Sequence, residues 1–340
     1  MIYRPSLSYN DVLLVPKYSD IVSRKEVDIS SQLDPCRSLE IPIISSPMDT
    51  ITESSMANAM ASSGGLGIIH RYNSIEMQAQ QAYQVADSEK KAAAIGIAGD
   101  YLERAQALYE VGVRILCLDV AHGHHILMKK AIENLKSLYS DVHIMAGNVA
   151  TKSGFEDLSS WGADSIRCNI GGGSICSTRT QTGHGVPGLQ TIFDCFSANV
   201  NRDVKIIADG GIRNSGDMVK ALAAGADFVM VGSLLAGSVE TPGDIIYSSD
   251  GKRRKIYRGM ASKEAQHNWK GTHSSNEGIS TTVTAKGSVS DIIEDLKNGI
   301  RSGLSYSGAR NITELQVNAE FIVQTSSGQV ESGTHILSRG

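Results

Sequence analysis

A chain of 340 residues with 41% hydrophobic and 20% charged side chains has the composition of a globular protein, which excludes a largely disordered, collagen-like or coiled-coil chain. Its net charge of −4 and its 5% aromatic content argue against binding nucleic acid or an anionic membrane. Five scattered cysteines without a CxxC pair predict neither a disulfide framework nor a zinc ribbon. With no signal-peptide pattern and no apolar run of about 18 residues, a cytoplasmic location is expected.

Eight short apolar runs recur along the chain, and each is bounded by Gly, Asp, Asn or Ser. They are Ile41–Ser45, Leu66–Ile69, Ala94–Ala98, Ile115–Asp119, Val142–Ala146, Ser165–Cys168, Val204–Ala208 and Phe228–Val231. The runs are continuous rather than alternating. Each therefore predicts a strand that is buried on both faces, as in a parallel sheet.

Amphipathic segments between the runs predict helices. They cover Glu53–Ser62, Ser74–Ala86 with an N-cap at Asn73 or Ser74, Tyr101–Val111 and His125–Leu138. Eight strands that alternate with helices predict an α/β fold of the (β/α)8 barrel class. An open, doubly wound parallel sheet is the alternative.

The polar stretch Tyr247–Gly287, after the eighth run, is too long for an ordinary connection. Such loops are usually functional or disordered, so a mobile flap is expected over about residues 247–287. Regular structure resumes in a predicted helix over Val289–Gly299, and Ser326–Gly340 is polar and glycine-rich. No linker separates a second domain, so residues 1–340 are expected to form one barrel domain.

The segment Ile170–Pro187 directly follows the predicted sixth strand, at the end of the barrel where active sites are built. Its glycines, Gly171–Gly173, let backbone groups approach a ligand, and Ser174 offers a hydroxyl. Cys176 follows on the same loop, close to Arg179. A thiolate near a cation is a nucleophile, and although a lone cysteine is more often a small packed residue, this context favours the nucleophile.

Two further glycine-rich segments follow the seventh and eighth runs, where barrels of this class commonly bind phosphate. In Ile207–Gly216, Asp209 ends a strand and suits a ribose diol, and Gly210–Gly211 leads into a helix N-terminus that suits a phosphate. Val231–Ser233 repeats the pattern after the eighth run. Together the segments predict a nucleotide phosphate site.

Several other conspicuous side chains have structural interpretations. His122, His124 and His125 lack the carboxylate or thiol neighbours of a metal site, so they are expected to line the barrel mouth or cap the following helix. The remaining predicted core and packing residues are Cys117, Cys168 and Cys195.

The motifs resemble those of the inosine monophosphate dehydrogenase / guanosine monophosphate reductase family, from about residue 5 to 335. The matching segments are Ser45–Thr50, Gly64–Arg71, Leu118–Gly123, Met145–Thr151, Gly171–Arg179, Ala208–Arg213, Val229–Gly237 and Tyr257–Ser262. The resemblance implies a (β/α)8 barrel, usually a homotetramer, that acts on C2 of the purine in GMP or IMP.

The resemblance also implies roles for individual residues. Cys176 matches the nucleophile that attacks C2, Thr178 its hydroxyl partner near the leaving group, and Glu277 a flap acid. Contacts to the purine nucleotide are implied for Ser46, Met48, Ser174, Asp209, Gly211, Gly232, Ser233, Tyr257, Gly259 and Met260. Contacts near the nicotinamide cofactor are implied for Asp119 and Asn148. Backbone carbonyls that could hold a monovalent cation, K⁺, are those of Gly171, Gly173 and Cys176, although the family usually has Pro at the position of Gly172.

The flap favours the reductase branch of the family. Dehydrogenases activate water with an Arg-Tyr pair on the flap, and this chain has no Arg between Met260 and Gly287. Asn276-Glu277-Gly278 resembles the reductase flap, where a Glu works with the Thr near the nucleophile to release ammonia. The segment around Asp119 also resembles the reductases.

Other segments resemble the dehydrogenases: SSPMDT, IIHR, YRGM and the tail Glu331–His335. The regulatory nucleotide-binding insertion of many dehydrogenases is absent, since Gln84–Lys91 runs directly into the third strand. The resemblance therefore implies a GMP reductase that uses NADPH to convert GMP into IMP and ammonia. The alternative is an IMP dehydrogenase without the insertion, which would convert IMP into XMP with NAD, and a remote one is a non-catalytic nucleotide-binding barrel.

Overall fold

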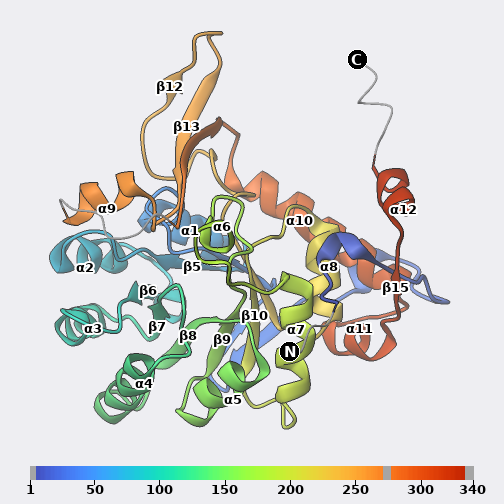
Figure 1. The fold of residues 1–340 in the computed structure, drawn as a ribbon, viewed down its shortest axis with the longest axis horizontal. Coiled ribbons are helices and arrows are strands. Elements are labelled where there is room, and N and C mark those ends of the chain that lie inside the picture. The colour runs from blue at the N-terminus through green and yellow to red at the C-terminus, as the bar shows by residue number, and fades with distance from the viewer. Residues whose placement is uncertain (1–4, 271–276, 334–340) are drawn as a thin grey trace.

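Eight parallel strands close into one barrel in the computed structural model, which describes residues 5–270 and 277–333 (Figure 1). They are β4 (Ile43–Ser45), β5 (Leu66–Ile69), β6 (Ala92–Ile95), β7 (Ile115–Asp119), β8 (His143–Val149), β9 (Ser165–Cys168), β10 (Lys205–Asp209) and β11 (Phe228–Val231). Strand β11 pairs with β4 and closes the ring. The (β/α)8 prediction is confirmed, and the open-sheet alternative is wrong. Three residues of the sequence motifs, Asn276, Thr334 and His335, lie outside the described part of the chain.

The continuous apolar runs arise because both faces of every barrel strand are buried. Alternate residues such as Ile44, Cys117 and Met230 point into a core inside the barrel, while their neighbours pack against the surrounding helices. The third strand begins at Ala92, two residues before the predicted start. Ala92 and Ala94 pack inside the barrel and Ala93 packs against the helices, so burial outweighs the low strand preference of alanine.

Helices connect the barrel strands, and the first four of them correspond to the four ranges predicted between the apolar runs. In chain order they are α1 (Ser54–Ser62), α2 (Ile75–Tyr83), α3 (Tyr101–Glu110), α4 (Ile126–Leu138), α5 (Lys152–Ser160), α6 (Thr178–Thr182), α7 (Gly188–Ala198) and α8 (Ser215–Ala223). The N-cap prediction is confirmed at Ser74, whose side chain accepts the N–H of Met77. His125 caps α4 in the same way, so one of its two predicted roles is confirmed.

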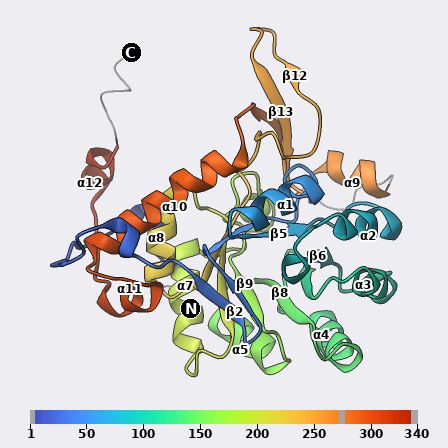
Figure 2. The same ribbon diagram turned by 180° about the vertical axis from the view of Figure 1, so that it is seen from behind.

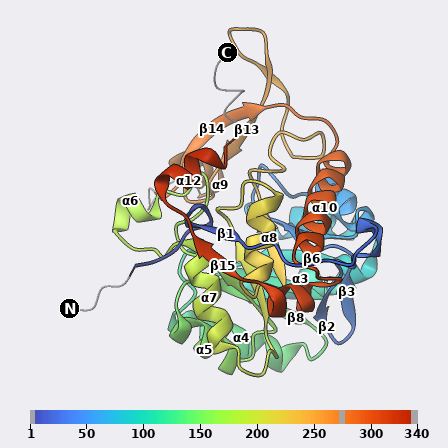
Figure 3. The same ribbon diagram turned by 90° about the vertical axis from the view of Figure 1, so that its right-hand side faces the viewer.

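Helix α10 (Val289–Tyr306) is longer than predicted. The sequence suggested an end at Gly299, but Gly299 and Gly303 lie where α10 packs closely on α8 (Figure 3). A β-carbon at Gly299 would lie 2.2 Å from the Ser215 hydroxyl, and one at Gly303 would lie 2.5 Å from Val219. These glycines therefore permit close helix packing instead of ending the helix.

The predicted flap contains regular structure. Strands β12 (Ile246–Tyr247), β13 (Arg253–Arg258) and β14 (Ser280–Thr284) form an antiparallel sheet, and α9 (Lys263–Lys270) lies beside α2. The β12–β13 arm projects beyond the ring of helices (Figures 1 and 2).

The two ends of the described chain are joined by a short sheet. In it β1 (Val12–Leu14) pairs with β15 (Phe321–Val323), and it is flanked by α11 (Ile312–Asn318) and α12 (Ser326–Glu331). Within the described residues, no helix combines the length and apolar character that crossing a membrane requires.

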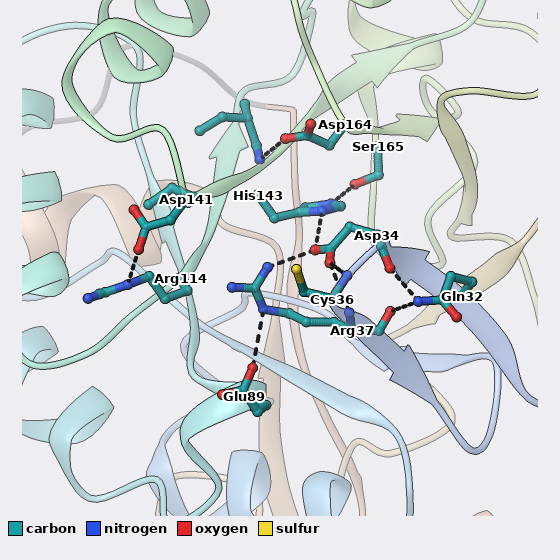
Figure 4. Close-up of polar contacts among 12 residues, drawn as sticks. Gln32, Asp34, Cys36, Arg37, Glu89, Arg114, Asp141, His143, Asp164 and Ser165 are labelled. Atoms are coloured by element: carbon teal, nitrogen blue, oxygen red, sulfur yellow. Dashed lines mark hydrogen bonds and ion pairs between the residues drawn. The ribbon is translucent and has the colours of Figure 1, made fainter.

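A hairpin closes the N-terminal end of the barrel, opposite the predicted site. It consists of β2 (Ser31–Asp34) and β3 (Arg37–Leu39), and its Leu33 and Leu39 join the core inside the barrel. Asp34 anchors it, accepting hydrogen bonds from the Arg37 guanidinium at 2.8 Å and from His143 Nδ1 at 3.0 Å (Figure 4). His143 Nε2 in turn lies 2.8 Å from the Ser165 hydroxyl, so the network reaches β8 and β9. Burial raises the pKa of Asp34, but the hydrogen bonds from His143 and Arg37 outweigh it and hold the pKa well below its usual range.

We expect Asp34→Asn to lower the free energy of unfolding at pH 7 by about 1–3 kcal/mol, because charge-assisted hydrogen bonds are lost. Because the pKa of Asp34 is lower in the folded than in the unfolded protein, its carboxylate stabilises the wild type fully above the unfolded pKa of about 4. This stabilisation is lost as the pH falls from there through the folded pKa. Urea unfolding between pH 7 and pH 3 measures the difference. Asp203→Asn, at an exposed aspartate, is the control. A difference that does not change with pH, or one no larger than that of the control, would contradict the anchoring role.

Candidate active site

A cavity of about 400 Å³ opens at the C-terminal ends of the barrel strands. Every residue with a predicted catalytic, substrate, cofactor or cation role lines it, from Ser46 after β4 to Glu277 on the flap. The parallel strands explain the convergence, because segments that are distant in sequence leave the barrel at the same end.

Three of these side chains form a hydrogen-bonded chain. The Cys176 sulfur lies 3.1 Å from the Thr178 hydroxyl, which donates to the Glu277 carboxylate at 2.8 Å. Since the single hydroxyl proton is directed at Glu277, the hydroxyl oxygen is available to accept the thiol proton. The arrangement provides a path for a proton between the thiol and the carboxylate, which we call the proton relay.

Backbone contacts hold the flap against the cysteine loop. The N–H of Ser177 donates to the carbonyl of Glu277 at 3.0 Å, and the N–H of Ile279 donates to the carbonyl of Ile175 at 3.1 Å. The position of Glu277 beside Thr178 therefore does not depend on one side-chain contact alone.

A second group of residues lines the part of the cavity that is predicted to hold a phosphate. We call this group the phosphate cradle and define it as Ser174, Gly211, Gly232, Ser233 and Tyr257. The Ser174 and Tyr257 hydroxyls lie 3.1 Å apart. A β-carbon at Gly232 would lie 3.1 Å from the Met48 sulfur and 3.4 Å from the Tyr257 hydroxyl. A side chain at this position would therefore crowd both neighbours, and glycine leaves the backbone accessible from the cavity. Burial raises the pKa of Tyr257, which keeps its hydroxyl protonated as a donor.

Sequence reasoning missed Arg167, a buried residue of β9. Its guanidinium lies 2.7 Å from the Asp119 carboxylate and 2.9 Å from that of Asp209, which also accepts the Asn148 amide at 2.7 Å. Burial raises the pKa of Asp119, but Arg167 and Arg71 outweigh it, so the pKa lies below its usual value. An arginine within an apolar run was the available sequence signal.

A cluster of Arg71, Tyr72 and Trp269 was also missed. The Arg71 guanidinium lies 4.9 Å from the Tyr72 ring centroid and 5.5 Å from that of Trp269, which α9 carries over the cavity. Arg71 Nε is buried without a hydrogen-bond partner, although the Asp119 carboxylate lies 3.6 Å away. This unused donor and the aromatic faces suit the polar groups and rings of a nicotinamide cofactor. No sequence signal identifies the cluster, because only folding brings the flap over β5.

Of the histidines after β7, His125 caps α4, and none of His122, His124 and His125 lines the cavity. His124 lies 2.7 Å from the Asp157 carboxylate, and the predicted core cysteines Cys117, Cys168 and Cys195 are buried. Burial raises the pKa of Cys117 to about 12, so it stays a thiol. In the described part of the chain, no group of three or more His, Cys, Asp or Glu side chains is arranged to hold a metal ion.

The glycine loop depends on Asn169, another residue that the sequence did not single out. Asn169 is 4% exposed, and its amide donates to the Asp209 carbonyl at 2.8 Å. A β-carbon at Gly172 would lie 2.1 Å from the Asn169 amide nitrogen. The asparagine thus occupies the space that a side chain at position 172 would require. The Gly173 carbonyl, one of those predicted to hold a cation, accepts the Cys176 N–H at 3.1 Å and keeps a second lone pair.

We expect Gly172→Ala to lower the free energy of unfolding by about 1–3 kcal/mol, because overpacking forces the loop and Asn169 apart. In the Asn169→Gly background the same substitution is expected to cost almost nothing. Thermal and urea unfolding of the four-member cycle measure this coupling, with Gly287→Ala as the control at an open position. Equal costs in both backgrounds would contradict the steric explanation.

Comparisons with known proteins agree with this architecture. The model of the "IMP dehydrogenase / GMP reductase domain" matches residues 6–335. Curated relatives include inosine-5′-monophosphate dehydrogenases from Nitrosopumilus maritimus, 34% identical over 98% of this chain and 99% of the relative, and from Borreliella burgdorferi, 38% identical over 98% of both.

Among solved structures, a GMP reductase from Trypanosoma brucei in complex with guanosine 5′-monophosphate superposes with a TM-score of 0.93. It is 30% identical, and the match covers 98% of each chain. The enzymes of this group are nicotinamide-dependent oxidoreductases of purine nucleotides, and the family resemblance of the sequence motifs is confirmed. The chain belongs to the IMP dehydrogenase / GMP reductase family.

Proposed function

We propose that this protein is a GMP reductase, which converts GMP, NADPH and a proton into IMP, ammonia and NADP⁺. The observation that carries the proposal is the proton relay, in which the Thr178 hydroxyl bridges the Cys176 thiol and the Glu277 carboxylate. A carboxyl acid next to the nucleophile suits a leaving group that departs as an amine. A non-catalytic nucleotide-binding barrel would have no use for this arrangement.

The cavity offers a place for each part of GMP. The phosphate cradle would hold the 5′-phosphate with hydroxyls and backbone N–H groups, and Asp209 would accept hydrogen bonds from the ribose. The base would then lie towards Cys176. The remaining residues that line the cavity and are proposed to contact the nucleotide are Ser46, Met48, Gly259 and Met260.

In the first step the Cys176 sulfur forms a bond to C2, and the thiol proton passes through Thr178 to Glu277. Glu277 then returns a proton to the exocyclic amine, which leaves C2 as ammonia. After hydride addition at C2, the C2–S bond breaks and the thiolate is regenerated with release of IMP. The relay therefore acts first as a base and then as an acid.

The nicotinamide cofactor would lie on the other side of the cavity, beside Asp119 and Asn148 and under the cluster of Arg71, Tyr72 and Trp269. When bound, the reduced nicotinamide supplies the hydride. Arg167 keeps the Asp119 and Asp209 carboxylates in fixed positions, so cofactor and ribose contacts are held by one buried cation. A K⁺ ion on the carbonyls of Gly171, Gly173 and Cys176 would stabilise the cysteine loop.

An IMP dehydrogenase is the second candidate, because the curated relatives named above are IMP dehydrogenases. That reaction requires an activated water, and the segment between Met260 and Gly287 contains no arginine to activate it.

We expect purified protein to oxidise NADPH with GMP faster than it reduces NAD with IMP. Absorbance at the nicotinamide band in both directions measures the ratio. Faster IMP oxidation would overturn the assignment.

We expect Glu277→Gln to lower kcat for GMP reduction by about 10²–10⁴, the usual contribution of general acid–base catalysis. The amide keeps the size of the side chain but cannot exchange the proton. GMP affinity is expected to change little, because the relay is separate from the phosphate cradle. Steady-state kinetics and calorimetry with GMP measure the two effects.

The matched control is Glu264→Gln, which removes an exposed flap carboxylate that pairs with Arg258 at 3.3 Å and does not line the cavity. Cys176→Ala should bind GMP without turnover. A normal kcat in Glu277→Gln would rule out the relay, whereas an equal loss in Glu264→Gln would indicate a general effect on the flap.

A further inference from the structure

A second cavity, of about 230 Å³, adjoins the phosphate cradle. We call it the rear cavity. It shares the cradle residues Ser174, Gly211 and Ser233 with the main cavity, and its far side is formed by the N-terminal segment and the loop before α7. A phosphate bound in the cradle would therefore border both cavities.

Tyr9 is the most informative residue of the rear cavity. It is only 5% exposed, and burial is the main cause that raises its pKa far above the usual range, so the phenol stays protonated. Its hydroxyl nevertheless forms no hydrogen bond with any described residue, although it borders the rear cavity. The hydroxyl is not among the buried polar atoms without a partner, so it is open to the rear cavity and free to donate to a ligand there.

The charge of the rear cavity favours an anion. Its lining contains two arginines, Arg179 and Arg213, and no Asp or Glu. Arg213 is paired with Asp217 at 3.0 Å. Arg179 donates only to the carbonyls of Ile170 and Val186, and its Nη1 has no hydrogen-bond partner among the described residues. Its positive charge is therefore not compensated by a neighbouring carboxylate.

We propose that the rear cavity binds the second phosphate of a purine nucleoside diphosphate whose first phosphate occupies the cradle. The Tyr9 hydroxyl would donate to the second phosphate, and Arg179 would balance its charge. The inference rests on the proposed function only for the position of the 5′-phosphate. A diphosphate bound in this way would exclude GMP, so GDP would be a competitive inhibitor.

Calorimetric titration of GMP and GDP into wild-type protein and Tyr9→Phe tests the proposal. The substitution removes one hydroxyl that forms no contact in the free protein, so folding should be preserved, which thermal unfolding verifies. We expect GDP to bind the wild type at least as tightly as GMP. Tyr9→Phe should weaken GDP binding about tenfold, the value of one hydrogen bond to a charged group, and should leave GMP binding unchanged. Tyr83→Phe, at an exposed tyrosine, is the matched control.

Three results would overturn the proposal: no binding of GDP where GMP binds, equal effects of Tyr9→Phe on both nucleotides, or saturable binding of inorganic phosphate to GMP-loaded protein without binding of GDP. A rear cavity that holds only water gives the first or the second result. Guanosine should bind far more weakly than GMP if the cradle holds the 5′-phosphate.

The same preparation is assayed for GMP reduction, and titrations with IMP and IDP run in parallel. Absence of GMP reduction would overturn the proposed function alone, since either pair of nucleotides still reports on the rear cavity.

Discussion

The closure of eight parallel strands is the constraint on which the site depends. Parallel pairing places every strand end of one kind at the same rim, so segments as distant as Ser46 and Glu277 reach one cavity of about 400 Å³. At the opposite rim, the β2–β3 hairpin covers the end of the barrel, and a hydrogen bond from His143 to Asp34 holds the hairpin in place. Stability and chemistry are thereby separated at the two ends of the same strands.

The sequence was sufficient for most of the architecture. Continuous apolar runs identified all eight barrel strands, since burial on both faces leaves a signal that does not depend on distant contacts. The predicted helix end at Gly299 was wrong, because this glycine makes room for Ser215 of another helix, and that contact forms only on folding. The arm and helix of the flap were also not predicted, since their short polar strands pair only with each other.

The candidate site was predictable where residues lie in motifs and not where they meet only after folding. The local pattern of the glycine-rich loops indicated Cys176 and the cradle residues other than Tyr257, and the family resemblance supplied Tyr257 and Glu277. Arg167, Trp269 and Asn169 escaped notice because each acts through partners on other strands or on the flap. Overall similarity does not distinguish the two family reactions, since relatives of both kinds match the entire barrel. The distinction depends instead on contacts between individual side chains in the cavity.

The pair of Asn169 and Gly172 also limits how this loop can evolve. With the amide nitrogen 2.1 Å from the position of a β-carbon, a side chain at position 172 forces the loop and the asparagine apart. A change between the Pro that the family usually has at position 172 and the present pair therefore costs least when position 172 is Gly before position 169 becomes Asn. Chains that combine a side chain at position 172 with an asparagine at position 169 would be destabilised, and we expect them to be rare.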